Sequence, residues 1–307
     1  MQQIDLLKCA LDHRHIQTQI GTANSHRCWI PSGQAPSVHN ATLDRNPECP
    51  INTMTDTARQ IIQLLDLTNL NDVCVPEDID LLCEFAITEA GPVAAVCLWP
   101  QFVNQASRIL KGTGVGIATV VNFPSGNEDA EQVASQAQKA IQEGADEIDL
   151  VMPYERLLKN ETSAVAKHIG TVRNALPTSV LLKVILETGE LKTPDYINLA
   201  SEIAIGQGAD FIKTSTGKCP VSATPAAADT MLEAIANSSK NIGFKASGGI
   251  RTIEQANVYL QLAESKLGKD WIHARHFRFG ASGLLQDALA QLPNADGTGA
   301  VPADTSY

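Results

Sequence analysis

The sequence lacks several features that would place it in large classes of protein. It contains no uninterrupted run of about 18 apolar residues, so we expect no membrane-spanning helix. Basic residues are few, 23 Lys and Arg against 34 Asp and Glu, and the net charge of −11 argues against non-specific binding to nucleic acid or anionic membranes. The N-terminus has no basic stretch followed by an apolar one, as a signal peptide would require. The cytoplasm is therefore the expected location.

The seven cysteines show no arrangement typical of a zinc site or a disulfide scaffold. Their number is odd, and no two are separated by only two residues. Free thiols in a reducing compartment are the simplest interpretation. Cys9, His13 and His15 lie close together, but a polar tail explains them better than a metal site. Cys97 has no histidine in a matching motif, which favours a packed thiol over a nucleophile.

The residue pattern changes near Met54. Residues 1–53 mix Gln, His, Asn, Ser and Pro without sustained periodicity, which predicts an irregular N-terminal extension. From Met54 onward, eight short apolar runs, suited to strands buried on both faces, alternate with eight helical stretches. The runs lie at 64–68, 92–99, 116–121, 147–151, 180–186, 210–213, 243–245 and 277–280. The helical stretches lie at 77–90, 101–111, 128–143, 161–175, 194–207, 225–237, 252–265 and 283–292.

Eight strand–helix units in about 250 residues predict an α/β fold, a closed (β/α)₈ TIM barrel. We expect this catalytic domain to occupy residues 54–292. Residues 293–307 are rich in Gly, Ala and Pro and are expected to form a flexible C-terminal tail. An open, doubly wound sheet is the alternative, and it is disfavoured because no glycine-rich dinucleotide-binding motif follows the first strand.

Lysines lie within or at the carboxyl ends of three predicted strands, where barrel residues face the active site. Lysine is depleted in strands and is rarely buried without a partner, so Lys183, Lys213 and Lys245 are unusual. Lys213 and Lys245 end neighbouring strands, which lie about 4.8 Å apart. Two ammonium groups in a desolvated pocket disfavour each other, so one is expected to lose its proton well below the free-lysine pKa of about 10.4. The neutral amine would then attack a carbonyl group.

A carboxylate offers a simpler interpretation of the same lysines. Asp149 ends the fourth predicted strand and could accept and return protons, or order a water. It could equally form only a structural salt bridge with a barrel lysine. From the residues alone, both interpretations remain open.

Glycine-rich turns follow the last two predicted strands. Gly248-Gly249-Ile250-Arg251 comes after one strand and opens a helix, and Gly280-Ala281-Ser282-Gly283 comes after the next. The backbone N–H groups of such turns and a helix N-terminus favour an anion. A phosphate site after the seventh and eighth strands is common in this architecture, so we expect one here. Gly217-Lys218 would add a third contact.

These segments resemble the 2-deoxyribose-5-phosphate aldolases from about Met54 to Tyr307. The resemblance rests on six segments in order: 66–70, 118–124, 182–191, 211–217, 243–249 and 278–282. It implies a class I aldolase, without metal or cofactor, whose small-molecule substrates are a phosphorylated sugar and acetaldehyde. Such an enzyme reversibly cleaves 2-deoxy-D-ribose 5-phosphate to acetaldehyde and D-glyceraldehyde 3-phosphate in deoxyribonucleotide catabolism.

The resemblance also implies a role for each site residue. Lys213 would form the Schiff base, and Lys245 would perturb the pKa of Lys213 and shuttle protons. Asp149 would relay protons through water, and the C-terminal Tyr307 would also transfer protons. The phosphate contacts would come from Gly217, Lys218, Gly248, Gly249, Arg251, Gly280 and Ser282.

Some features depart from the family pattern. Gly283 stands where some relatives carry a second serine, so one phosphate hydrogen bond is lost or replaced by a backbone N–H. Residues 1–53 match nothing in the pattern, and a homodimer is left open. Three other functions also remain open: a class I aldolase for a different phosphorylated sugar, an isomerase or synthase without covalent chemistry, and an inactive sugar-phosphate sensor.

Overall fold

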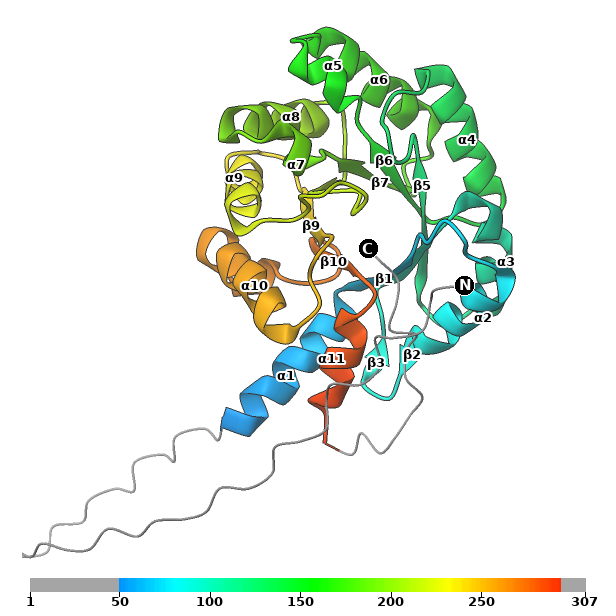
Figure 1. Cartoon of the computed structure of the whole chain (residues 1–307), viewed down its shortest axis with the longest axis vertical. Coiled ribbons are helices and arrows are strands. Elements are labelled where there is room, and N and C mark those ends of the chain that lie inside the picture. The colour runs from blue at the N-terminus through cyan, green and yellow to red at the C-terminus, as the bar shows by residue number, and fades with distance from the viewer. Residues whose placement is uncertain (1–49, 294–307) are drawn as a thin grey trace, which may run out of the picture. The chain divides into compact units, whose positions relative to one another are not determined.

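Eight parallel strands close into a barrel in the order β1-β10-β9-β8-β7-β6-β5-β4 (Figure 1). The computed structural model describes residues 50–293, with side chains from residue 54. The strands are β1 (Leu65–Asn69), β4 (Ala95–Leu98), β5 (Gly116–Val121), β6 (Glu147–Val151), β7 (Leu181–Ile185), β8 (Phe211–Lys213), β9 (Gly243–Ser247) and β10 (Phe277–Ala281). The barrel closes where β10 pairs with β1, with Leu65 opposite Phe279. This confirms the predicted TIM barrel and excludes the open sheet.

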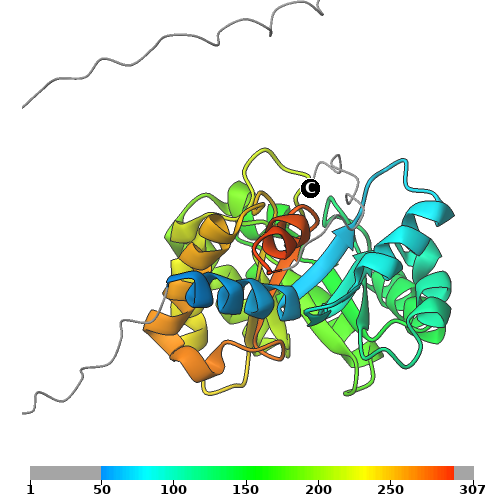
Figure 2. The ribbon, with the colours of Figure 1, turned by 90° about the horizontal axis from the view of Figure 1, so that it is seen from below.

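Helices surround the ring of strands, as Figures 1 and 2 show. Three of them are capped by a threonine: Thr193, Thr224 and Thr252 each accept a backbone N–H through the side chain. None of the helices among residues 50–293 is long and apolar enough to span a bilayer. The helices that follow the barrel strands are α2 (Pro76–Phe85), α3 (Val103–Ile109), α4 (Ala130–Gln142), α6 (Thr162–Ala175), α8 (Pro194–Gly206), α9 (Pro225–Ala236), α10 (Ile253–Leu267) and α11 (Leu284–Ala290).

A helix not anticipated from the sequence precedes the first strand. This helix, α1 (Pro50–Gln63), packs beside α11, and its residues Ile61 and Ile62 are fully buried (Figure 1). The expected domain boundary at Met54 therefore falls inside a helix. Residues 1–49 and 294–307, which include most of the expected extension and nearly all of the expected tail, lie outside the described residues.

The first predicted helical stretch, 77–90, was too long at its end. Helix α2 ends at Phe85, and a short antiparallel hairpin follows, made of β2 (Ile87–Thr88) and β3 (Gly91–Pro92). Gly91 has a φ of 108°, a value open to glycine but not to a helical residue. The remaining short elements are η1 (Pro100–Phe102), α5 (Tyr154–Leu158), α7 (Thr188–Leu191) and η2 (Lys269–Trp271).

Candidate active site

Charged side chains from six strands meet in the interior of the barrel. Contacts between strands that are not neighbours, such as Lys183 on β7 with Asp66 on β1 at 3.4 Å, can be made only through this interior. Seven charged residues take part, and none of them is more than 5% exposed to solvent. We call them the charged cluster: Asp66, Glu147, Asp149, Lys183, Lys213, Lys245 and Arg278. A buried charge is costly unless it is paired, so the pairing determines what the cluster can do.

Asp149 lies at the centre of the cluster and binds three lysines. Its Oδ1 accepts a hydrogen bond from Lys183 Nζ at 2.7 Å. Its Oδ2 accepts from Lys245 Nζ at 2.8 Å and from Lys213 Nζ at 2.9 Å. Burial alone would raise the pKa of Asp149. The three lysines, of which Lys183 has the largest effect, instead hold this pKa well below its usual value. Asp149 is therefore ionised.

A second group of contacts surrounds Asp66 and Glu147. Asp66 lies 2.6 Å from Lys245 Nζ and 2.5 Å from Arg278 Nη1. Glu147 accepts from Arg278 Nη2 at 3.0 Å and contacts Lys183. Burial would lower the pKa of Lys183 and of Lys245. The neighbouring carboxylates, of which Asp149 has the largest effect, instead raise both pKa values above the usual value. These two lysines therefore remain protonated.

The charges of the cluster balance only when one lysine is neutral. Arg278 is always charged, and with the two lysines of raised pKa it supplies three cations. These cations balance the three carboxylates. Lys213 Nζ shares one oxygen of Asp149 with the Lys245 ammonium group, so a proton on Lys213 is opposed by a like charge close by. The arrangement favours a neutral amine at Lys213, the form that attacks carbonyl groups.

The predicted phosphate turns lie together at the carboxyl end of the barrel. Gly217, Gly248 and Gly249 have φ values of 79°, 87° and 82°, in the left-handed region. A Cβ on Gly248 would lie 3.2 Å from the Cα of Gly217, so the two turns touch. Gly248 N also donates to Gly280 O at 3.4 Å, which joins this turn to the end of β10.

The side chains expected to help bind phosphate are less enclosed. Arg251 is exposed, before the start of α10, and Ser282 is half-buried. Lys218 Nζ pairs with Asp72 at 2.9 Å, across the mouth of the barrel from the loop after β1. Glycine turns whose backbone N–H groups can approach an anion, with Lys218 and Arg251 in the same segments, are suited to a phosphate group.

Comparison with known proteins agrees with this geometry. Residues 60–286 match the DeoC/LacD family of aldolases. The chain belongs to this family. A relative from Agrobacterium fabrum, named deoxyribose-phosphate aldolase, is 53% identical over 242 residues, which cover 78% of this chain and 93% of the relative.

Two solved structures have the fold of this aldolase. One, from Coccidioides immitis, is provisionally described as a deoxyribose-phosphate aldolase; it is 33% identical, with a TM-score of 0.67 over 75% of this chain and 85% of that one. The other, from Toxoplasma gondii, has the same provisional description; it is 25% identical, with a TM-score of 0.74 over 80% of this chain and 100% of that one.

Glu147 and Arg278 belong to the charged cluster of the aldolase but were not assigned to the site from the sequence. A signal for both was present. Glu147 stands two residues before Asp149, and Arg278 stands between two phenylalanines. Since alternate strand residues share a face, a charge at such a position in an apolar strand indicates a polar barrel interior.

Cys97 is a buried thiol in the aldolase, as the sequence predicts. Burial raises the pKa of its thiol, which keeps the sulfur in its unreactive protonated form. The expected site residue Tyr307 lies outside the described residues.

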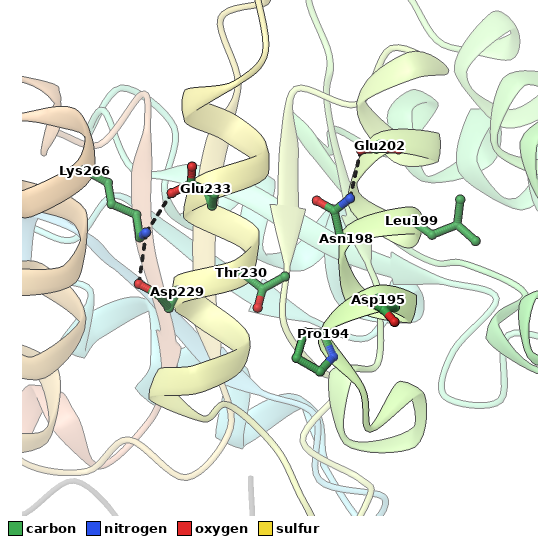
Figure 3. Close-up of a pocket in the computed structure, with 9 residues that line it drawn as sticks. All are labelled: Pro194, Asp195, Asn198, Leu199, Glu202, Asp229, Thr230, Glu233 and Lys266. Atoms are coloured by element: carbon green, nitrogen blue, oxygen red, sulfur yellow. Dashed lines mark hydrogen bonds and ion pairs between the residues drawn. The ribbon is translucent and has the colours of Figure 1, made fainter.

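A hollow of about 650 Å³ on the outside of the barrel is separate from this site (Figure 3). It lies over α8, α9 and α10 and contains no member of the charged cluster. Most of its charged side chains pair with a neighbour: Lys266 with Asp229 at 3.1 Å and Glu233 at 2.8 Å, and Glu202 with Asn198 at 2.8 Å. We do not assign it to the active site.

Proposed function

We propose that the chain is a deoxyribose-phosphate aldolase, which reversibly cleaves 2-deoxy-D-ribose 5-phosphate to acetaldehyde and D-glyceraldehyde 3-phosphate through a Schiff base on Lys213. The observation that carries the proposal is that Lys213 Nζ and the protonated Lys245 Nζ share one oxygen of Asp149, which favours a neutral amine at Lys213. The name of the Agrobacterium fabrum relative supports the substrate. The role of the enzyme would lie in deoxyribonucleotide catabolism.

The proposed reaction begins when the Lys213 amine adds to carbon 1 of the open-chain sugar. Loss of water leaves a protonated imine. Removal of the proton from the 3-hydroxyl then breaks the bond between carbons 2 and 3, and the imine takes up the electron pair as an enamine. Glyceraldehyde 3-phosphate leaves, the enamine is protonated at carbon 2, and hydrolysis releases acetaldehyde.

Asp149 and Lys245 are proposed to move the protons in these steps. Asp149 Oδ2 lies within hydrogen-bond distance of both Lys213 Nζ and Lys245 Nζ. A carboxylate that contacts the reacting nitrogen and a protonated lysine can pass protons between them, directly or through water. The low pKa of Asp149 keeps it ionised, the form that accepts hydrogen bonds from both nitrogens.

The sugar phosphate is proposed to bind at the glycine turns. The turns that contain Gly217, Gly248, Gly249 and Gly280, with Lys218, Arg251 and Ser282, would hold it through backbone N–H groups and side chains. The dianion would compete with Asp72 for the Lys218 ammonium group. Anchoring the phosphate away from carbons 1 to 3 would orient the reacting end.

Three further expectations stay predictions. Tyr307 is proposed, from the sequence alone, to transfer protons at carbon 2, so its removal is expected to slow proton exchange of acetaldehyde with solvent. The homodimer and the cytoplasmic location rest on sequence reasoning.

The decisive experiment is to incubate the protein with acetaldehyde and sodium borohydride and then to measure its intact mass and map its peptides. We expect one ethyl group, about 28 Da, on Lys213 and not on Lys183 or Lys245. Lys213→Ala is the control and should gain no mass at the site. A folded wild-type protein without this adduct would refute the covalent mechanism with acetaldehyde as donor.

A further inference from the structure

Glu187 has a backbone conformation that residues with side chains rarely adopt. It lies between β7 and α7, with a φ of 58° and a ψ of 59°, in the left-handed region. Glycine reaches this region without steric cost, whereas glutamate does not. Contacts of the side chain must therefore offset this cost, and such positions often lie at functional sites.

The carboxylate of Glu187 is fully buried and binds the turn that follows β8. Thr216 Oγ1 donates to Glu187 Oε2 at 2.5 Å. The backbone N–H of Thr216 lies 3.2 Å from the same oxygen and 3.4 Å from Oε1. Beside it, Thr188 N donates to Thr214 O at 3.0 Å. Glu187 thus extends the pairing of β7 with β8 beyond the ends of the strands.

Thr216 passes this constraint on to the phosphate turn. The hydroxyl that donates to Glu187 also accepts the backbone N–H of Lys218 at 3.1 Å. Gly217, between them, is left-handed and touches the Gly248 turn. The carboxylate therefore fixes the direction of the hydroxyl, and the hydroxyl fixes the turn from residue 216 to residue 218.

We propose that Glu187 is the positioning residue for recognition of the substrate's phosphate group. It holds the Thr216–Lys218 turn in the conformation that receives the phosphate and acts on binding through that turn. This inference rests on the proposed function, since it assumes that the turn binds the phosphate of a sugar.

The test compares Glu187→Ala and Glu187→Gln with the wild type on 2-deoxyribose 5-phosphate and on unphosphorylated 2-deoxyribose. Loss of a charge-assisted anchor should raise the KM of Glu187→Ala for the phosphorylated sugar about 10- to 100-fold, with kcat nearly unchanged. Its kcat/KM for the unphosphorylated sugar should stay within about twofold of the wild type. Glu187→Gln should recover most of the loss, because its amide oxygen can still accept from Thr216.

Two further variants control the experiment. Glu190→Ala removes a half-buried carboxylate three residues away and should leave both KM values unchanged. Thr216→Val removes the hydroxyl but keeps the shape, and should reproduce the KM change of Glu187→Ala. It also provides the test if Glu187→Ala does not fold.

Inhibition by inorganic phosphate gives a second measurement. Its Ki should rise in parallel with KM in Glu187→Ala and Thr216→Val. Equal losses on both sugars, or a KM that does not change, would overturn the role in phosphate recognition. A wild type that cleaves neither sugar would instead refute the proposed function, and phosphate-induced thermal stabilisation of the wild type and variants would still test Glu187.

Discussion

Replacing Lys245 with leucine should move the acidic limb of the pH–rate profile upward by about two pH units. In the wild type, Lys213 and Lys245 share one oxygen of Asp149, at 2.9 and 2.8 Å. Lys245 is held protonated by the carboxylates around it. Its charge therefore opposes a proton on Lys213, and leucine removes that opposition.

The magnitude follows from the geometry. Because both nitrogens lie within 2.9 Å of the same oxygen, they are no more than about 6 Å apart. Two unit charges at that distance repel by about 3 kcal/mol at an effective dielectric constant of about 20. At about 1.4 kcal/mol for each pH unit, this corresponds to about two units.

The assay is kcat/KM for cleavage of 2-deoxyribose 5-phosphate from pH 5 to pH 10, together with the rate of borohydride trapping at each pH. The position of the acidic limb reports the proton on Lys213, whereas the height of the plateau reports lost proton transfer by Lys245. Lys245→Arg is the matched control, because it keeps the charge and should leave the limb in place. A limb that stays in place in Lys245→Leu, or moves to lower pH, would refute the proposed repulsion between Lys245 and Lys213.

Other consequences of the cluster and the turns can be measured separately. Asp149→Asn should abolish cleavage and lower the free energy of unfolding in urea by about 3–5 kcal/mol, because it leaves buried cations without their partner; a loss below about 1 kcal/mol would contradict that pairing. Gly280→Ala should destabilise the protein by about 1–3 kcal/mol, because a Cβ would lie 2.6 Å from Ser247 Oγ. Gly283→Ala, with nothing within 4 Å of the added atom, should leave stability nearly unchanged, and equal effects of the two glycine variants would argue against the clash. Ion pairing lowers the pKa of Asp66 despite its burial, so its stabilisation is fully present above the unfolded pKa of about 3.9 and is lost as the pH falls below it. In Asp66→Asn, Tm should therefore fall less steeply with pH below about pH 4 than in the wild type. The same steep fall of Tm in the variant would contradict this linkage.

The strands were predictable because each is a short apolar run with turns on both sides. The runs at 116–121 and 147–151 agree residue for residue with β5 and β6. The hairpin at 87–92 was missed because its strands are two residues long, too short to show a period, and continue the apolar pattern of α2. Helix α1 was missed because it precedes the first repeat unit and its apolar residues are interleaved with Thr, Asp and Gln.

The site was predictable to the extent that its residues are unusual for strands. Lysines at strand ends stand out in the sequence, and in the structure each of the three donates a hydrogen bond to Asp149. The Schiff-base role of Lys213 stays a prediction. The pairing itself was not predictable. Asp66 and Arg278 are 212 positions apart and meet only because the last strand closes on the first. The periodicity of a single strand contains no information about that partner.

That closing contact also sets a time scale for the protein's synthesis. A ribosome adds about 5–20 residues each second, so Asp66 is made about 10–40 s before Arg278. During this interval Asp66 has only lysines made before Arg278 as partners, and β1 and β9 each have no neighbour on the side that β10 will occupy. The backbone groups on these strand edges stay unpaired with another strand until β10 has been made. The closed barrel therefore forms only after the ribosome has translated β10.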